Sequence, residues 1–209
     1  MKLVFTGIQG CGKWTQARLL EKKYWYSVLE MWAEFRKVVA SGSELWNTLK
    51  DIMARGDQVN GDMGRKVMET AIKNCESDKV IYDWFIRNDW NIDVFDAMLP
   101  EYKVILFELS EEKSKQRLLG RMFNPKTGET FMTWTVTDPK TGDELIRRAD
   151  DNEEGILKRI DLYREVTLPV VEQQKAEWKI IEVNADQAID DVFAELEEKL
   201  WLSVEKDYC

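Results

Sequence analysis

The fold is decided by the stretch Gly7-Ile8-Gln9-Gly10-Cys11-Gly12-Lys13-Trp14-Thr15. It follows a short apolar segment at 2–6 and opens a helical pattern at 13–24, which is the context that a phosphate-binding P-loop requires. Glycines let backbone N–H groups turn inward around phosphate oxygens, and the positive end of the helix dipole adds to the attraction. The loop therefore predicts a nucleotide site, in preference to a glycine-rich turn without a ligand. We expect Lys13 to reach the β and γ phosphates and Thr15 to serve the Mg²⁺ region.

Strand and helix candidates alternate along the rest of the chain. Short runs rich in Val, Ile, Leu, Phe or Tyr predict strands at 2–6, 26–30, 79–83, 103–109 and 179–184. Helical patterns lie between them, at 13–24, 30–41, 44–55, 61–76, 90–98, 111–121, 152–174 and 187–201. This alternation predicts an α/β fold with a five-stranded parallel sheet, helices on both faces, and ligands at the carboxyl ends of the strands.

The segment 122–146 interrupts the alternation. It holds two near-copies, Asn124-Pro125-Lys126-Thr127-Gly128-Glu129 and Asp138-Pro139-Lys140-Thr141-Gly142-Asp143. Each copy is typical of a tight turn built on Pro and Gly. Because arginines stand on both sides of the segment, we interpret it as a small antiparallel flap rather than a plain surface insertion.

Composition and charge argue against several classes of protein. The 209 residues carry a net charge of -9, which argues against a general nucleic-acid binder, although arginines focused in one cleft still attract nucleotides. No apolar run of about 18 residues predicts a membrane span, and the chain starts on a strand without a signal-peptide pattern, so we expect a cytoplasmic protein. The three cysteines, Cys11, Cys75 and Cys209, form neither a disulfide framework nor a zinc site. With no histidine, any proton chemistry lacks imidazole.

Motifs along nearly the whole chain resemble those of adenylate kinases. They are, in order, Thr15-Gln16-Ala17, Ser41-Gly42-Ser43-Glu44-Leu45, Ile52-Met53-Ala54-Arg55-Gly56-Asp57, Asp83-Trp84-Phe85-Ile86-Arg87, Arg117-Leu118-Leu119-Gly120-Arg121, Arg148-Ala149-Asp150-Asp151, Lys158-Arg159, Tyr163 and Thr167-Leu168-Pro169. The resemblance implies one P-loop domain with a core at 1–29, 61–121 and 149–209, a monophosphate-binding insert at 30–60 and a lid at 122–148. It also implies a monomer without structural zinc, since the flap lacks the four cysteines that some relatives carry.

The resemblance implies a role for each matching position. The ATP side would consist of Gly10, Cys11, Gly12, Lys13, Trp14, Thr15, Arg117, Arg121 and Gln187. The AMP side would consist of Met31, Trp32, Arg36, Met53, Val59, Asp83, Trp84, Phe85, Arg87, Asn91, Arg148 and Arg159. Arg36 and Arg87 would grip the AMP phosphate, because the planar guanidinium binds phosphate through two parallel hydrogen bonds. Asp83 and Thr15 would hold Mg²⁺, largely through water. The catalytic set would be Lys13, Arg87, Arg121, Arg148 and Arg159.

The activity that the resemblance implies is Mg²⁺-dependent transfer of a phosphoryl group from ATP to AMP, giving two ADP. Such transfer needs positioning, charge neutralisation and exclusion of water, which suits many arginines, one P-loop lysine and no histidine. Lid closure would keep water out. Two alternatives stay open: a kinase for another monophosphate, such as GMP or UMP, and a nucleotide-binding relative that does not catalyse transfer.

Tryptophan stands where these kinases have glycine. The chain has 9 Trp and only 11 Gly, and five tryptophans occupy glycine positions of the family pattern: Trp14, Trp25, Trp32, Trp46 and Trp84. We interpret this as miscoding, in which the source lineage reads the UGA codon as glycine and the chain is written with UGA read as tryptophan. The alternative is a degenerate relative with a spoiled site, which leaves Trp25, Trp46 and the intact arginines unexplained. With Trp14 in the loop, we expect a rate lower by about 10² to 10⁴.

Overall fold

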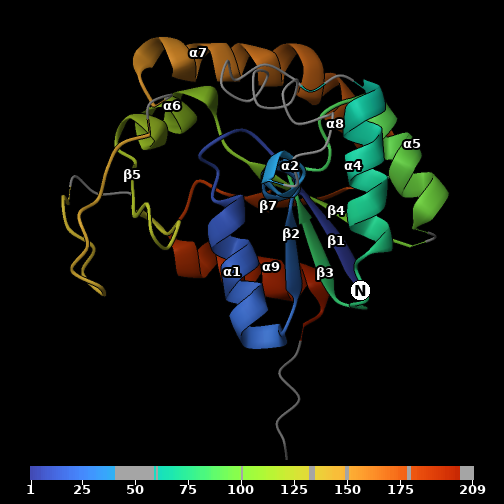
Figure 1. The fold of residues 1–209 in the computed structure, drawn as a ribbon, viewed down its shortest axis with the longest axis horizontal. Helices are drawn as coiled ribbons and strands as arrows, with labels where there is room; N and C mark the ends of the chain where they lie inside the picture. Colours follow the sequence, from blue (N-terminus) through green and yellow to red (C-terminus); the bar gives the residue numbers. More distant parts are fainter. Residues whose placement is uncertain are drawn as a thin grey trace, which may run out of the picture.

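A computed structural model describes residues 1–40, 59, 61–99, 101–131, 135–148, 151–177 and 180–202. Its centre is a five-stranded sheet in the order β2-β3-β1-β4-β7, in which each neighbouring pair is parallel (Figure 1). The strands are Lys2–Thr6 (β1), Ser27–Glu30 (β2), Val80–Asp83 (β3), Lys103–Glu108 (β4) and Ile180–Asn184 (β7). Every one of them lies within a predicted strand segment, so the predicted parallel sheet is confirmed.

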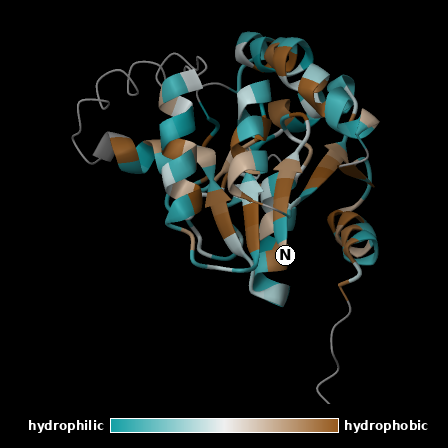
Figure 2. Cartoon of the chain, turned by 90° about the vertical axis from the view of Figure 1, so that its right-hand side faces the viewer, coloured by the Kyte–Doolittle hydropathy of each residue, from teal (hydrophilic) through white to brown (hydrophobic). Residues whose placement is uncertain are grey.

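Both faces of this sheet are buried. Successive residues of a strand point to opposite faces, so β1 sends Leu3 and Phe5 into one apolar cluster and Val4 into the other. Helices α1 (Lys13–Tyr24) and α9 (Ile189–Leu200) pack on the first cluster, and α4 (Gly61–Lys73) and α5 (Asp89–Met98) pack on the second. Figure 2 shows the strands as a hydrophobic layer between these helices. Burial on two faces explains why the strands are nearly continuous apolar runs.

The other helices follow the predicted ranges with one difference. They are α2 (Met31–Ala40), α6 (Glu111–Leu119), α7 (Glu153–Leu162) and α8 (Leu168–Ala176). The segment predicted as one helix at 152–174 contains a π-helical turn, Tyr163–Thr167, between α7 and α8. The helix predicted at 44–55 lies outside the described residues, as does most of the insert predicted at 30–60. None of the described helices is long and apolar enough to cross a membrane.

The flap predicted from the two near-copies is confirmed. Strands β5 (Met122–Phe123) and β6 (Thr130–Phe131) pair antiparallel, and the flap projects to one side of the sheet (Figure 1). In each copy the glycine N–H donates back to the first residue of the turn, from Gly128 to Asn124 O at 2.8 Å and from Gly142 to Asp138 O at 2.9 Å. Both glycines have a φ of 74°, so the repeated sequence forms the same turn twice.

Candidate active site

The loop between β1 and α1 has the backbone that its glycines predict. Gly7, Gly10 and Gly12 have φ values of 134°, 78° and 97°, in the region that side chains disfavour. At Gly7 there is no room for a side chain either, because a Cβ would lie 2.6 Å from the carbonyl oxygen of Phe107. Helix α1 then begins at Lys13, so its first N–H groups lie beside the loop. This arrangement suits an anion such as phosphate.

Lys13 is the buried cation of the loop, with 6% of its surface exposed. Its Nζ donates to the carbonyl oxygens of Gly7 at 2.7 Å and Ile8 at 3.1 Å, and it lies 3.3 Å from Cys11 Sγ. The ammonium group is thus held by neutral acceptors of the loop itself. A bound phosphate would offer it charged acceptors, which form stronger hydrogen bonds.

Asp83, the last residue of β3, is a buried carboxylate next to this cation. Burial raises the pKa of Asp83 to about 7, the lysine charge at Lys13 and the Trp84 N–H lower it, and the charge of Glu30 raises it. The Asp83 Oδ1 atom is buried and accepts no hydrogen bond from the described residues. A buried carboxyl oxygen without a protein partner can be satisfied by water, by a cation or by a ligand.

Trp84 and Arg87 follow directly after β3 and lie against one another. The Arg87 guanidinium carbon is 4.7 Å from the centre of the Trp84 ring, and Lys13 Nζ is 5.3 Å from it. The indole therefore contacts the P-loop cation and Arg87 at once. Burial lowers the pKa of Arg87 to about 10, which shows that its charge is poorly solvated. An anionic ligand would compensate that loss of hydration.

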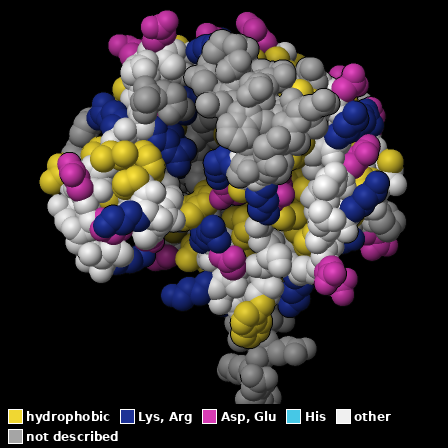
Figure 3. All heavy atoms as spheres, in the orientation of Figure 1, with side chains coloured by type: hydrophobic (Ala, Val, Ile, Leu, Met, Phe, Trp, Pro, Cys, Tyr) yellow, Lys and Arg dark blue, Asp and Glu magenta, His cyan; other side chains and the backbone are white. Residues whose placement is uncertain are grey.

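Two cavities meet at these residues. One is lined by Gly7, Gln9, Lys13 and residues of the π-helical turn, and the other by Met31, Trp32, Phe35, Val59 and Asn91. Trp84 and Arg87 line both. Figure 3 shows Lys and Arg side chains gathered in the middle of this face of the molecule. The P-loop side and the α2 side are therefore neighbouring compartments that share a guanidinium.

One carboxylate, Asp151, holds two arginines that lie on either side of the flap in the sequence. Arg121 precedes the flap, Arg159 lies on α7, and both donate to Asp151, which is fully buried. Burial by itself raises the pKa of Asp151, but hydrogen bonds and charge from Arg121 and Arg159 lower it overall. Arg148 is exposed, and its guanidinium lies 5.0 Å from the ring centre of Phe123.

Two residues of the expected ATP side, Arg117 and Gln187, both contact the chain at and just after the end of β7. Arg117 donates to the carbonyl oxygen of Ala185 at 2.8 Å and lies 3.5 Å from that of Gly10. Gln187 donates to the carbonyl oxygen of Asn184 at 2.9 Å and to Glu195 at 2.6 Å. Arg117 thus joins the P-loop to the loop that carries Gln187.

Some expected AMP residues line the second cavity and others do not. Met31, Trp32, Val59 and Asn91 line it. Arg36 is exposed, lies 3.9 Å from Glu30 and does not line this cavity, and Phe85 is 0% exposed within the core. Asn91 accepts the N–H groups of Arg87 and Asn88 through its side-chain oxygen, which caps α5. Met53 lies outside the described residues.

The oxygen atoms beside the P-loop suit a Mg²⁺ ion that keeps most of its water ligands, rather than a metal site formed entirely by protein side chains. Among the described residues, no group of three or more His, Cys, Asp or Glu side chains is placed to hold a metal. Asp83 has an unpartnered carboxyl oxygen and Thr15 is half-buried at the start of α1, so each offers an oxygen of the kind with which Mg²⁺ binds through water and substrate phosphates.

The motif pattern assigns no role to Asp151, Tyr163 or Thr167, which the structure brings to the site. The π-helical turn carries Tyr163 and Thr167, and both line the P-loop cavity. Burial raises the pKa of Tyr163 to about 12, so it stays a neutral hydroxyl there. The π-helical turn has no sequence signal that sets it apart from the helices on either side. For Asp151, the sequence signal is its place in the motif Arg148-Ala149-Asp150-Asp151, three residues after an arginine.

The fold and site define a P-loop nucleotide-binding protein of the kinase type. The family model for adenylate kinase matches residues 5–179. The chain is 30% identical to the adenylate kinase of Chloroherpeton thalassium, over 96% of this chain and 98% of that protein. It is also 30% identical to those of Alkaliphilus oremlandii, over 94% and 96%, and Borreliella burgdorferi, over 92% and 94%. The chain belongs to the adenylate kinase family.

Proposed function

We propose that the chain transfers the γ-phosphoryl group of ATP to AMP and yields two ADP. One observation carries the proposal: Trp84 and Arg87 line both cavities, so a phosphate at the P-loop and a second phosphate at the α2 side would meet beside one guanidinium. The names of the relatives support adenine nucleotides as substrates.

In this proposal the side chains of the site position phosphates and neutralise charge. Lys13 binds the phosphates at the loop, and Arg87 holds the acceptor phosphate. Arg121, Arg148 and Arg159 neutralise the transferring group when the lid, 122–148, closes and excludes water. Asp83 and Thr15 hold Mg²⁺, which supplies further charge neutralisation when bound.

The test uses a chain with glycine at positions 14, 25, 32, 46 and 84, which we call the glycine form. ADP production from ATP, AMP and Mg²⁺ is measured for this form and for the same form with Arg87→Ala. We expect activity in the first and a loss of about 10² or more in the second, the usual effect of removing one charged transition-state contact. Arg65→Ala is the matched control, because Arg65 is a partly exposed α4 residue that lines neither cavity. Equal activity of the Arg87 variant and the control would contradict the proposal.

A second candidate is a kinase for another monophosphate. It is favoured by Asn91, a residue of the expected AMP side. Its side-chain oxygen already accepts the N–H groups of Arg87 and Asn88, so that oxygen is not available to accept a hydrogen bond from the base of AMP. Replacing AMP in the same assay by GMP, UMP or CMP separates the two candidates: faster turnover with one of these would identify it as the acceptor.

A further inference from the structure

The left-handed backbone positions of the described chain belong to two residue types only. Five are glycines, Gly7, Gly10, Gly12, Gly128 and Gly142. The other three are Trp25, Trp84 and Trp201, with φ values of 57°, 66° and 55°. In this region a Cβ collides with the following carbonyl, and a bulky residue there is an outlier. Asn and Asp, the side chains that tolerate it best, occupy none of these positions.

Trp201 is the glycine position of a helix-ending motif. Helix α9 ends at Leu200, the Trp201 N–H donates to Glu198 O at 3.1 Å, and the Leu202 N–H donates to Glu197 O at 3.0 Å. This pair of hydrogen bonds is the Schellman motif, whose left-handed residue is usually glycine. The Trp201 side chain is 88% exposed, so no burial of the indole offsets the strain.

Trp25 repeats this situation at the end of α1. Its N–H donates to Glu21 O at 3.0 Å, the single bond of the αL ending, in which glycine is again the usual residue. The Trp25 side chain is 81% exposed. Trp25 and Trp201 therefore share two unfavourable features, a strained backbone and a large apolar side chain exposed to water, at helix ends that are far apart in the sequence.

Trp84 adds a functional consequence. Its indole contacts both Lys13 and Arg87 and lines both cavities, so it occupies space in which phosphates would contact these two cations. Glycine at this position would release the backbone strain and open that space. Strain and obstruction thus coincide at one residue of the proposed site.

We infer that the functional protein carries glycine at positions 25, 84 and 201, because the codons there are read as glycine in its source. The backbone evidence is independent of the motif pattern, and it adds position 201, which the motifs do not reach. Trp14, Trp32 and Trp90 lie in helices, where the backbone accepts either residue, so the inference does not rest on them.

The direct test is the mass of peptides from the protein isolated from its own cells. Trypsin releases residues 24–36, 80–87 and 200–206, which hold the three positions. We expect glycine masses at 25, 84 and 201, and tryptophan masses would overturn the inference. This readout does not depend on activity, so glycine masses together with an inactive glycine form would reject the proposed function and leave the inference standing.

A second test compares glycine with alanine in the chain as written. Trp25→Gly and Trp201→Gly are each expected to raise the unfolding midpoint by about 2 to 4 °C. Trp25→Ala and Trp201→Ala remove the indole but keep the Cβ, so they should gain clearly less. Trp90→Gly is a control for which we expect the opposite effect. The Trp90 ring packs on Gly64, where an added Cβ would lie 2.7 Å from the ring. Removing the Trp90 side chain should therefore lower the unfolding midpoint. Equal midpoints for the glycine and alanine variants would overturn the backbone argument.

Discussion

The Arg121 guanidinium binds the Asp151 carboxylate through two hydrogen bonds, of 2.8 Å from Nε to Oδ2 and 2.6 Å from Nη2 to Oδ1. Arg159 donates to the same Oδ1 at 2.7 Å. Since Arg121 precedes the lid and Asp151 follows it, one carboxylate joins the two ends of the lid and orients two of the proposed catalytic arginines.

Replacing Asp151 by Asn should therefore cost both stability and rate. Asp151 is fully buried, and breaking a buried ion pair from one side typically costs about 3 kcal/mol or more of the free energy of unfolding. Urea unfolding and ADP production of the glycine form measure the two effects. The matched control is Glu111→Gln, which breaks the exposed pair of Glu111 with Arg164 and should change stability by less than about 1 kcal/mol. A similar loss in both variants would contradict the role of burial.

The Asp151 carboxylate should also make the free energy of unfolding depend on pH in the acid range. Its pKa is lowered by folding, so its contribution is fully present above the ordinary aspartate pKa of about 4 and is lost as the pH falls through the lower folded value. We expect the stability difference between the parent chain and Asp151→Asn to be constant from about pH 8 to 5 and to shrink below about pH 4. Urea midpoints at each pH give the difference, and one that grows on acidification would show the opposite sign.

Arg87→Lys should impair the glycine form although the charge is kept. A lysine presents a point charge and loses the paired hydrogen bonds that a guanidinium gives to a phosphate. We expect kcat/KM for AMP to fall by about 10² with little change in ATP binding, because Lys13 and the loop would bind ATP. Steady-state kinetics in AMP and calorimetric titration with ATP measure the two, and an equal loss of ATP affinity would place Arg87 in the ATP site instead.

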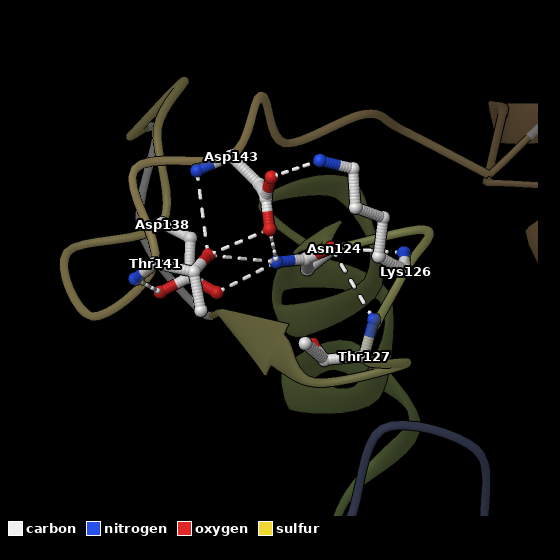
Figure 4. A network of polar contacts seen from close by, with 6 residues as sticks. All are labelled: Asn124, Lys126, Thr127, Asp138, Thr141 and Asp143. Atoms are coloured by element: carbon white, nitrogen blue, oxygen red, sulfur yellow. Dashed lines mark hydrogen bonds and ion pairs between the residues drawn. The ribbon is translucent and has the colours of Figure 1, made fainter.

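The lid should loosen when Asn124 is replaced by Ala. The Asn124 amide donates to Asp138, Thr141 and Asp143, and its oxygen accepts the Lys126 N–H, so it ties the two turns together (Figure 4). Without it, two neighbouring carboxylates lose a shared donor.

Hydrogen exchange at the Gly128 and Gly142 amides, which close the two turns, measures this loosening. We expect exchange at least about tenfold faster, the change that corresponds to about 1.4 kcal/mol, with little change in core amides. Glu129→Gln, which breaks only the exposed ion pair with Lys140, is the control. Unchanged exchange in the Asn124 variant would show that other contacts hold the flap.

The chain as written should be slower than the glycine form by about 10² to 10⁴, and the structure indicates which tryptophan matters most. Trp84 contacts Lys13 and Arg87, whereas Trp14 turns its indole to Glu30, to which it donates at 2.7 Å, and it lines neither cavity. Starting from the chain as written, Trp84→Gly should restore more ADP production than Trp14→Gly. The reverse order would assign the loss to the loop backbone.

The sequence alone determined the sheet, its five strands, the P-loop and the flap. These features rest on local signals: apolar runs of five or so residues, glycines that permit a left-handed backbone, and Pro-Gly turns repeated at 124–129 and 138–143. Motif order also placed Lys13, Asp83 and Arg87 near one another, because the carboxyl ends of parallel strands share an edge.

Only the tertiary structure decided what each side chain of that edge contacts. Asp151 joins Arg121 to Arg159, the π-helical turn brings Tyr163 to the P-loop, and Asn91 caps its own helix. These pairings depend on where separate elements pack, which no local pattern records. The strain at Trp25, Trp84 and Trp201 likewise becomes visible only as a backbone angle, because a left-handed φ is a property of the folded chain and not of the residue name.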